Sequence, residues 1–197
     1  MPLTRLANLL TLSRILAIPV VIATFYVSGD YARWFGCAFF TAAALTDWLD
    51  GQVARRWEQQ SELGRFLDPI ADKLLVAATL FMLTACGRLS SEALLPALVI
   101  LCREILVSGL REYLAGLRVG LPVSRLAKWK TTIQMVAIGV LIVGDAGPRA
   151  LPVTAIGETL LWLAAILTLV TGYDYLRAGL SHMTRPAPEP RGKSHPA

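Results

Sequence analysis

The sequence has few charged residues for its length. Of its 197 residues, only 17% are charged whereas 55% are hydrophobic, and the mean hydropathy is +0.55. This composition is too apolar for an ordinary soluble domain and excludes a disordered chain. Lys and Arg number 19 against 14 Asp and Glu. In so apolar a chain, we interpret this excess as a topology signal and as an attraction to anionic partners, and we expect no binding of nucleic acid.

Cysteine and histidine are also scarce. Cys37, Cys86 and Cys102 lie in or beside apolar segments without a CxxC spacing, and His182 and His195 both lie near the C-terminus. A disulfide framework needs several cysteines at suitable spacings, and a structural zinc site needs clustered Cys and His. The sequence therefore predicts neither kind of site.

Six long apolar segments dominate the chain. They cover residues 8–27, 31–49, 70–86, 94–117, 123–143 and 151–176. About 20 apolar residues let an α-helix cross a bilayer core, so each segment is predicted to be a transmembrane helix. We expect an all-α polytopic membrane domain over residues 1–183, built as a bundle of six transmembrane helices. Residues 184–197, which are rich in Pro and polar residues, are expected to form a disordered cytoplasmic tail.

Basic residues are distributed unevenly between the two sides of this predicted bundle. One side collects those of the N-terminus and of residues 55–73, 111–130 and 177–193, whereas the other side has Arg33, Arg88 and Arg149. Basic loops stay in the cytoplasm, so both termini are predicted to be cytoplasmic.

Four aspartates lie where the second and third predicted helices approach the cytoplasmic interface. Asp47 and Asp50 are three residues apart, and Asp68 and Asp72 are four apart. These spacings place each pair on one helix face, so an antiparallel hairpin could bring all four carboxylates together. Clustered carboxylates need a cation among them, and oxygen ligands without Cys or His favour Mg²⁺ or Mn²⁺. Two such ions could hold a pyrophosphate.

Small residues lie beside the aspartates. Gly51 and Ala54 follow the first pair, and Gly64 precedes the second. Small side chains would let a nucleotide approach the metal ions closely. The two glycines could instead mark helix ends or close helix packing.

The full pattern is Asp47-x2-Asp50-Gly51-x2-Ala54-Arg55-x8-Gly64-x3-Asp68-x3-Asp72. It resembles the signature of the CDP-alcohol phosphatidyltransferase family at all eight fixed positions. The resemblance implies a six-helix membrane bundle, usually homodimeric, whose active site opens to the cytoplasm. It also implies transfer of a phosphatidyl group from a CDP-lipid to an alcohol, with release of CMP.

The same resemblance implies a role for each position of the motif. It makes Asp47, Asp50 and Asp68 ligands of two divalent cations, Mg²⁺ or Mn²⁺, with Asp72 as a further ligand and as the general base. The residues that it assigns to nucleotide binding are Asp47, Asp50, Gly51, Ala54, Arg55 and Gly64.

Cations on the fourth and fifth predicted helices bear on the identity of the alcohol. Arg103, Arg111 and Lys130 could point toward one cavity, which would suit an acceptor that carries a phosphate. Alternatively, Glu104 and Glu112 could neutralise the two arginines, or Lys128 and Lys130 could reach lipid headgroups. Arg14 lies inside an apolar segment, where a charge costs at least ~2.5 kcal/mol unless it faces a polar cavity.

Four further strings, NLLTLSR, DPIADKLL, REILVSGLREYLAG and KWKTTIQMVA, resemble segments of the bacterial phosphatidylglycerophosphate synthases. This resemblance implies CDP-diacylglycerol and glycerol 3-phosphate as substrates, and the cytoplasmic membrane of a bacterium as the location. It assigns Arg14, Arg103, Arg111 and Lys130 to the acceptor phosphate. The possible entrance residues are Asn8, Thr11, Lys128 and Thr131.

Three alternatives stay open at this point. The same chemistry could use inositol phosphate or another alcohol, although the cations argue against serine, which lacks a phosphate. A cation transporter would place acids near the middle of the helices, whereas these aspartates gather at one end. A catalytically inactive scaffold is disfavoured because no acid of the motif is missing.

Overall fold

The computed structural model describes residues 6–57, 62–116 and 125–183, and this part of the chain contains six α-helices and no strand. The helices are α1 (Leu6–Phe25), α2 (Asp30–Trp57), α3 (Glu62–Ala85), α4 (Leu94–Gly116), α5 (Arg125–Val143) and α6 (Val153–Met183). A short 3₁₀ turn, η2 (Gly144–Ala146), follows α5. Each predicted apolar segment overlaps one of these helices, so the all-α prediction is confirmed for the described residues. The predicted tail lies outside the described residues.

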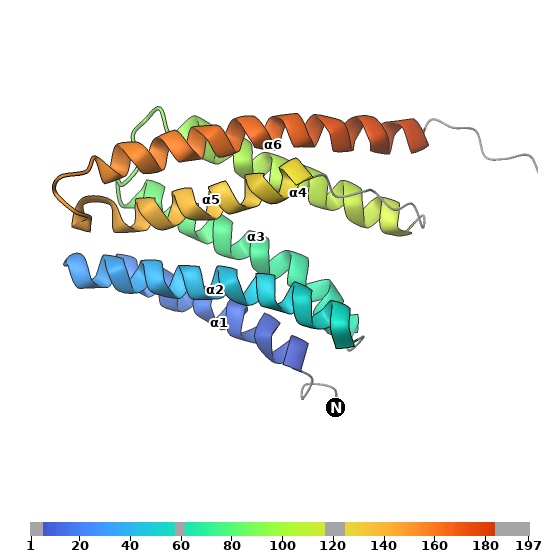
Figure 1. Ribbon diagram of the computed structural model, residues 1–197, viewed down its shortest axis with the longest axis horizontal. Helices are drawn as coiled ribbons and strands as arrows, with labels where there is room; N and C mark the ends of the chain where they lie inside the picture. Colours follow the sequence, from blue (N-terminus) through green and yellow to red (C-terminus); the bar gives the residue numbers. More distant parts are fainter. Residues whose placement is uncertain (1–5, 58–61, 117–124, 184–197) are drawn as a thin grey trace, which may run out of the picture.

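Successive helices run in alternating directions along the bundle (Figure 1). α1 packs against α2 and α3, α2 packs against α5, and α6 packs against both α4 and α5. The last part of α2 and the first part of α3 lie at the same end of the bundle (Figure 1). We call this end the aspartate end, because these two helix segments carry the aspartates of the motif.

Glycines and arginines close the opposite end of the bundle. Gly29 and Gly87 adopt positive φ angles of 113° and 65° in the turns before α2 and after α3, a conformation that strains other residues. Arg33 pairs with Asp145 at 3.4 Å. Arg88 donates a hydrogen bond to the Ile142 carbonyl at 3.3 Å, and burial lowers the pKa of its guanidinium. Arg88 thus satisfies a carbonyl at the C-terminal end of α5, and Arg33 binds the 3₁₀ turn that follows it.

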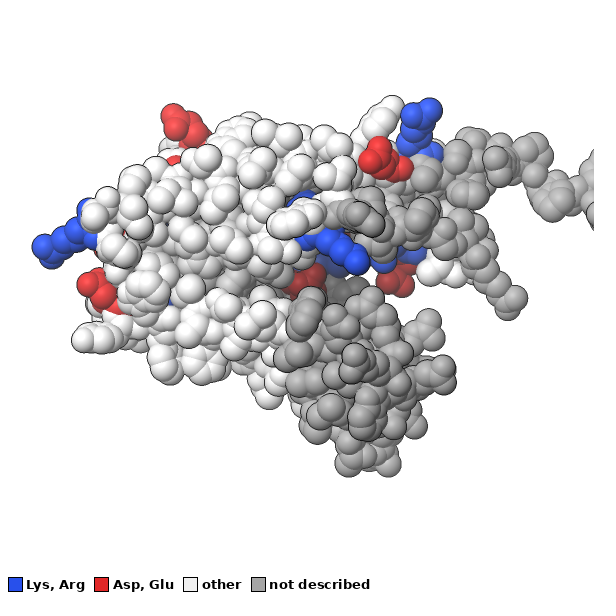
Figure 2. All heavy atoms as spheres, in the orientation of Figure 1, with Lys and Arg blue, Asp and Glu red and all other residues white. Residues whose placement is uncertain are grey.

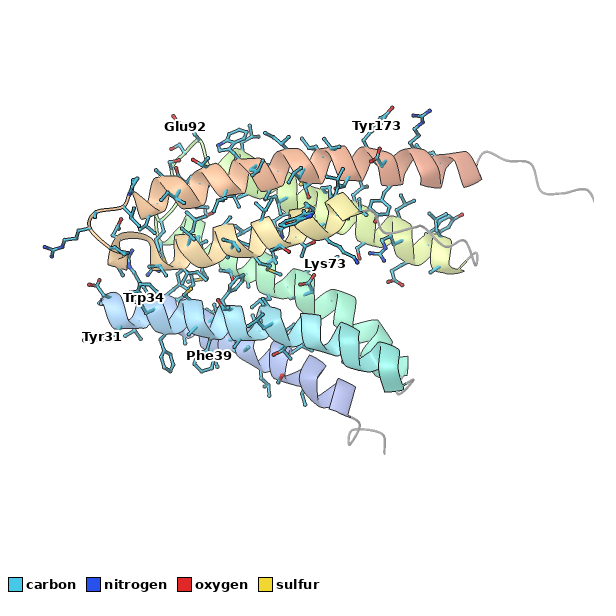
Figure 3. All side chains as sticks on the ribbon, in the orientation of Figure 1. Tyr31, Trp34, Phe39, Lys73, Glu92 and Tyr173 are labelled. Carbon is cyan, nitrogen blue, oxygen red and sulfur yellow. The ribbon has the colours of Figure 1, made fainter. Side chains whose placement is uncertain are left out.

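Apolar side chains form both the core and much of the outer surface. Phe40, Leu75 and Ile138 are almost completely buried. Phe39 and Tyr173 project outward from α2 and α6 (Figure 3), with 36% and 65% of their surface exposed. Figure 2 shows charged side chains at the end opposite the aspartate end and again closer to the aspartate end. A broad band of uncharged side chains separates the two groups. Helices that are apolar all round are typical of membrane proteins.

Two segments of the described chain are long and apolar enough to cross a membrane. They are Leu126–Ala146, with 21 residues, and Val153–Arg177, with 25 residues. The other helices carry more charge toward the aspartate end, which interrupts their apolar runs. α2 continues beyond residue 49 to Trp57, and α3 begins at Glu62 rather than at residue 70.

Candidate active site

The aspartates of the motif lie on two helices that pack against each other. Asp47 and Asp50 are on α2, and Asp68 and Asp72 are on α3, and the two helices are in contact. This arrangement is the helical hairpin that the spacing predicts. The side chains of Asp47, Asp50 and Asp68 lie outside the described residues, whereas the Asp72 side chain is described and half-buried.

The small residues and the arginine of the motif also lie within helices. Gly51, Ala54 and Arg55 are inside α2, and Gly64 is in the first turn of α3. Gly51 is therefore not a helix end. The side-chain surroundings of these four residues lie outside the described residues.

A cavity of about 500 Å³ lies between α3, α4 and α5. Its polar lining comes from Asp72 and Lys73 of α3, from Glu104, Ser108 and Glu112 of α4, and from Thr131 and Gln134 of α5. Figure 3 labels Lys73 where α3 faces the other two helices. The remaining lining is apolar and includes Leu74, Leu101 and Met135. The cavity lining therefore combines polar and charged side chains with apolar ones.

Glu104 joins two of the predicted acceptor cations beside this cavity. Its Oε1 accepts a hydrogen bond from Lys130 Nζ and lies 3.3 Å from Arg103 Nη1. Asp72 also interacts electrostatically with Lys130. The structure thus brings Arg103 and Lys130 together through one carboxylate, and it favours the alternative in which Glu104 neutralises Arg103.

Arg103 is directed toward α6. Its Nη2 donates a hydrogen bond to Thr171 Oγ1 at 2.9 Å, and its guanidinium carbon lies 5.9 Å from the centre of the Tyr175 ring. A Cβ atom at Gly172 would lie 3.1 Å from Arg103 Cγ. The missing side chain at Gly172 therefore leaves the space that the arginine occupies.

The other predicted acceptor and entrance residues occupy different positions. Arg14 is almost completely buried on α1 and is not one of the described residues that line the cavity. Arg111 and Lys128 are exposed on α4 and α5, and Thr131 is exposed and lines the cavity. The side chains of Asn8 and Thr11 lie outside the described residues. None of the four predicted acceptor cations is among the described residues that line the cavity. The basic residue in that lining is Lys73.

The donor set of the motif fits a hard divalent cation. The described side chains contain no group of three Asp, Glu, His or Cys that could hold a metal ion, but three of the four aspartates are not among them. The helix positions place four carboxylates and no Cys or His in the two packed segments. Oxygen ligands of this kind are those that Mg²⁺ and Mn²⁺ prefer.

Three residues of this region escaped the sequence-based prediction. Lys73 directly follows the last aspartate of the motif and lines the cavity. Gln134 is a polar residue inside an apolar segment, one helical turn from Lys130, and this position was a usable signal. Thr171 gave no signal, because its contact with Arg103 depends on how α4 and α6 are rotated against each other.

Comparison with known proteins places the chain in a family. The chain belongs to the CDP-alcohol phosphatidyltransferase family, whose model matches residues 4–170. The family inferred from the eight-residue motif is therefore confirmed. The match covers all the aspartates and the cavity residues.

The curated relatives are similar over most of their length. A protein of Rickettsia bellii is 47% identical over 173 residues, which cover 88% of this chain and 94% of the relative. A protein of Cereibacter sphaeroides is 38% identical, with 89% of this chain and 96% of the relative covered. A protein of Shigella flexneri is 40% identical, with 87% and 92% covered. Each is named CDP-diacylglycerol–glycerol-3-phosphate 3-phosphatidyltransferase.

Proposed function

We propose that this protein transfers the phosphatidyl group of CDP-diacylglycerol to glycerol 3-phosphate and releases CMP. The observation that carries this conclusion is the complete aspartate motif on two packed helices, in a chain that is similar almost end to end to relatives of that name. The product is phosphatidylglycerophosphate. The class of enzyme is a transferase of substituted phosphate groups.

The carboxylates are proposed to hold two divalent cations. Asp47, Asp50 and Asp68 would be ligands, and Asp72 would be a further one; Mg²⁺ and Mn²⁺ match these oxygen donors. Such ions, when bound, polarise the diphosphate of the CDP-lipid and stabilise the negative charge of CMP. Gly51, Ala54, Arg55 and Gly64 would shape the space for the cytidine nucleotide.

Asp72 is proposed as the general base. The acceptor hydroxyl attacks the phosphorus next to the diacylglycerol, and the bond from this phosphorus to the oxygen of CMP breaks. Asp72 takes the proton of the attacking hydroxyl. The position of Asp72 on the cavity wall supports this role, because a general base must lie within reach of its substrate.

The acceptor phosphate is proposed to lie near Lys130, Arg111 and Arg14. Lys130 is hydrogen-bonded to Glu104, which lines the cavity. Arg111 is on the same helix as Glu104, two turns nearer the aspartate end. The guanidinium of Arg103 is hydrogen-bonded to Thr171. Arg103 would therefore contribute to phosphate binding mainly by holding Glu104 and Lys130 in place. Asn8, Thr11, Lys128 and Thr131 would border the entrance.

The protein is proposed to be a homodimer in the cytoplasmic membrane of a bacterium, with six membrane spans. The alternating helices, the exposed apolar side chains and the unequal distribution of basic residues support this topology, with both termini and the active site on the cytoplasmic side. Residues 1–183 would form the catalytic domain, and residues 184–197 would form a disordered tail.

Acceptor-dependent release of CMP tests the proposed function. Purified protein in detergent would be given CDP-diacylglycerol with Mg²⁺ or Mn²⁺, together with glycerol 3-phosphate, inositol phosphate, serine or no acceptor. We expect CMP release with glycerol 3-phosphate and little with the others. Release with a different alcohol would keep the chemistry and overturn the acceptor, and release with none of them would overturn the proposal.

A further inference from the structure

Glu104 places a carboxylate between two cations at the wall of the cavity. Its Oε1 atom accepts a hydrogen bond from Lys130 Nζ on α5 and lies 3.3 Å from Arg103 Nη1 on its own helix. Glu104 lines the cavity, with 17% of its side-chain surface exposed. Lys130 is not among the described residues that line the cavity, and only 4% of its side-chain surface is exposed. A ligand in the cavity therefore meets the carboxylate of Glu104 before it meets the ammonium of Lys130.

The two cations that bind Glu104 are held in different ways. The guanidinium of Arg103 also donates a hydrogen bond to Thr171 at 2.9 Å, and its carbon lies 5.9 Å from the centre of the Tyr175 ring. Lys130 ends in an ammonium on a flexible four-carbon chain, and the described side chain that it binds is Glu104. Lys130 can therefore change its partner while Arg103 stays with Glu104.

We propose that Glu104 competes with a substrate phosphate for Lys130, so that the ammonium passes from the carboxylate to the phosphate when substrate binds. This inference rests on the proposed function, in which both substrates carry phosphate. The carboxylate opposes binding in two ways, because it holds Lys130 and because its negative charge repels the phosphate. Arg103 keeps the carboxylate paired after Lys130 has left, which avoids the cost of a partly buried charge without a partner.

The competing phosphate can come from either substrate. Glycerol 3-phosphate carries a dianionic monoester, whereas CDP-diacylglycerol carries a diphosphate. Both lie close to the reacting groups in the proposed site, and Lys130 interacts there with Asp72. The Michaelis constants of the two substrates separate the two sources. A change in the KM for glycerol 3-phosphate assigns the acceptor phosphate to Lys130, and a change in the KM for CDP-diacylglycerol assigns the diphosphate to it.

Glu104→Gln tests the competition directly. The amide keeps the size of the side chain and still accepts a hydrogen bond from Lys130, but the bond is weaker because the negative charge is lost. We expect the KM for the competing substrate to fall by about three- to tenfold. A residue that only supported the fold would give the opposite sign, because its loss would weaken substrate binding.

Glu112→Gln is the matched control for the loss of charge. Glu112 lines the same cavity on the same helix, and it makes no ion pair with another described residue. Its replacement removes one negative charge from the lining without releasing a cation. We therefore expect either KM to fall by about twofold at most.

The thermal midpoint in detergent measures phosphate binding without turnover. Inorganic phosphate would be added to the full-length protein at constant ionic strength, without either substrate. A ligand that binds the folded protein raises the midpoint in proportion to its affinity. Phosphate should therefore raise the midpoint of Glu104→Gln by at least about twice the rise in wild-type protein, and Glu112→Gln should respond as wild-type protein does.

The outcomes separate the competition from the proposed function. A KM for both substrates that is unchanged or higher in Glu104→Gln would overturn the competition, and so would an equal fall in Glu112→Gln. If Glu104→Gln does not fold, Glu104→Asp keeps the charge beside Arg103 and withdraws the carboxylate from Lys130, so the same signs are expected and the same results would overturn it. Failure of wild-type protein to use glycerol 3-phosphate would overturn the proposed function, whereas the response of the midpoint to inorganic phosphate would still decide the role of Glu104.

Discussion

The guanidinium of Arg103 on α4 donates a hydrogen bond to the hydroxyl of Thr171 on α6, with 2.9 Å between Nη2 and Oγ1. The same arginine binds Glu104, which in turn binds Lys130 on α5. A continuous chain of polar contacts therefore links α6, α4 and α5 next to the cavity. We propose that Arg103 anchors these helices to one another beside the cavity.

Replacement of Thr171 by valine tests this anchor. The variant removes the hydrogen-bond acceptor and leaves part of a buried guanidinium unpaired, so we expect unfolding to become easier by about 1–3 kcal/mol. The thermal midpoint in detergent would report the loss. Thr159→Val is the control, because the Thr159 hydroxyl donates to the Ala155 carbonyl of its own helix on an exposed surface, and its midpoint should hardly change. Equal midpoints for the two variants would contradict the anchoring role.

Replacement of Gly172 by alanine tests the space reserved for Arg103. The new Cβ would lie 3.1 Å from Cγ and 3.2 Å from Nε of Arg103, and the arginine cannot easily yield because Glu104 and Thr171 hold it. We expect destabilisation of about 1–3 kcal/mol. Gly109→Ala is a matched control on α4, since no heavy atom lies within 4 Å of its Cβ, and alanine should stabilise that helix by up to about 1 kcal/mol. Effects of the same sign in both variants would argue against close packing at Gly172.

Apolar segments predicted the number and order of the described helices but not their lengths. α2 extends from the predicted end at residue 49 to Trp57, and α3 starts at Glu62 rather than at residue 70. An apolar run marks the part of a helix that can lie in lipid, whereas the charged turns QVARRW and ELGRFLDP remain helical beyond it. The aspartates consequently lie within helical turns, so that spacings of three and four residues place each pair on one helix face.

Asparagine substitutions should separate the roles of two aspartates. Asp72→Asn removes the proposed base, so turnover should fall by at least about 100-fold while binding of CDP-diacylglycerol is largely kept. Asp50→Asn removes a proposed metal ligand, so it should weaken both turnover and binding. CMP release and a direct binding assay with CDP-diacylglycerol would measure the two effects. An equal loss of binding in both variants would contradict this division of roles.

Replacement of Arg111 by alanine tests the site proposed for the acceptor phosphate. Loss of a charged partner should raise the KM for glycerol 3-phosphate by about tenfold and the KM for CDP-diacylglycerol by much less. Arg177→Ala provides the control, because Arg177 is also exposed near the aspartate end but lies on α6. A larger rise in the KM for CDP-diacylglycerol would move Arg111 to the nucleotide site.

The sequence predicted the chemistry of the site better than its contacts. The spacing of the aspartates along α2 and α3 follows from helix geometry alone, so the motif could be placed without coordinates. The partner of Arg103 could not be placed, because Glu104 is its neighbour in sequence while Thr171 is far from it along the chain. The position of Gln134 beside the cavity depends on which helix faces pack together, and composition does not reveal this.

Incorporation of labelled glycerol 3-phosphate into lipid is the direct test of the proposed phosphatidyl transfer. Purified protein would be incubated with CDP-diacylglycerol and labelled glycerol 3-phosphate, and the labelled lipid and the released CMP would be quantified together. We expect one labelled phosphatidylglycerophosphate for each CMP, and the loss of both products in Asp72→Asn. Release of CMP without label in the lipid, or labelled lipid that still forms at the wild-type rate in Asp72→Asn, would contradict the proposed transfer.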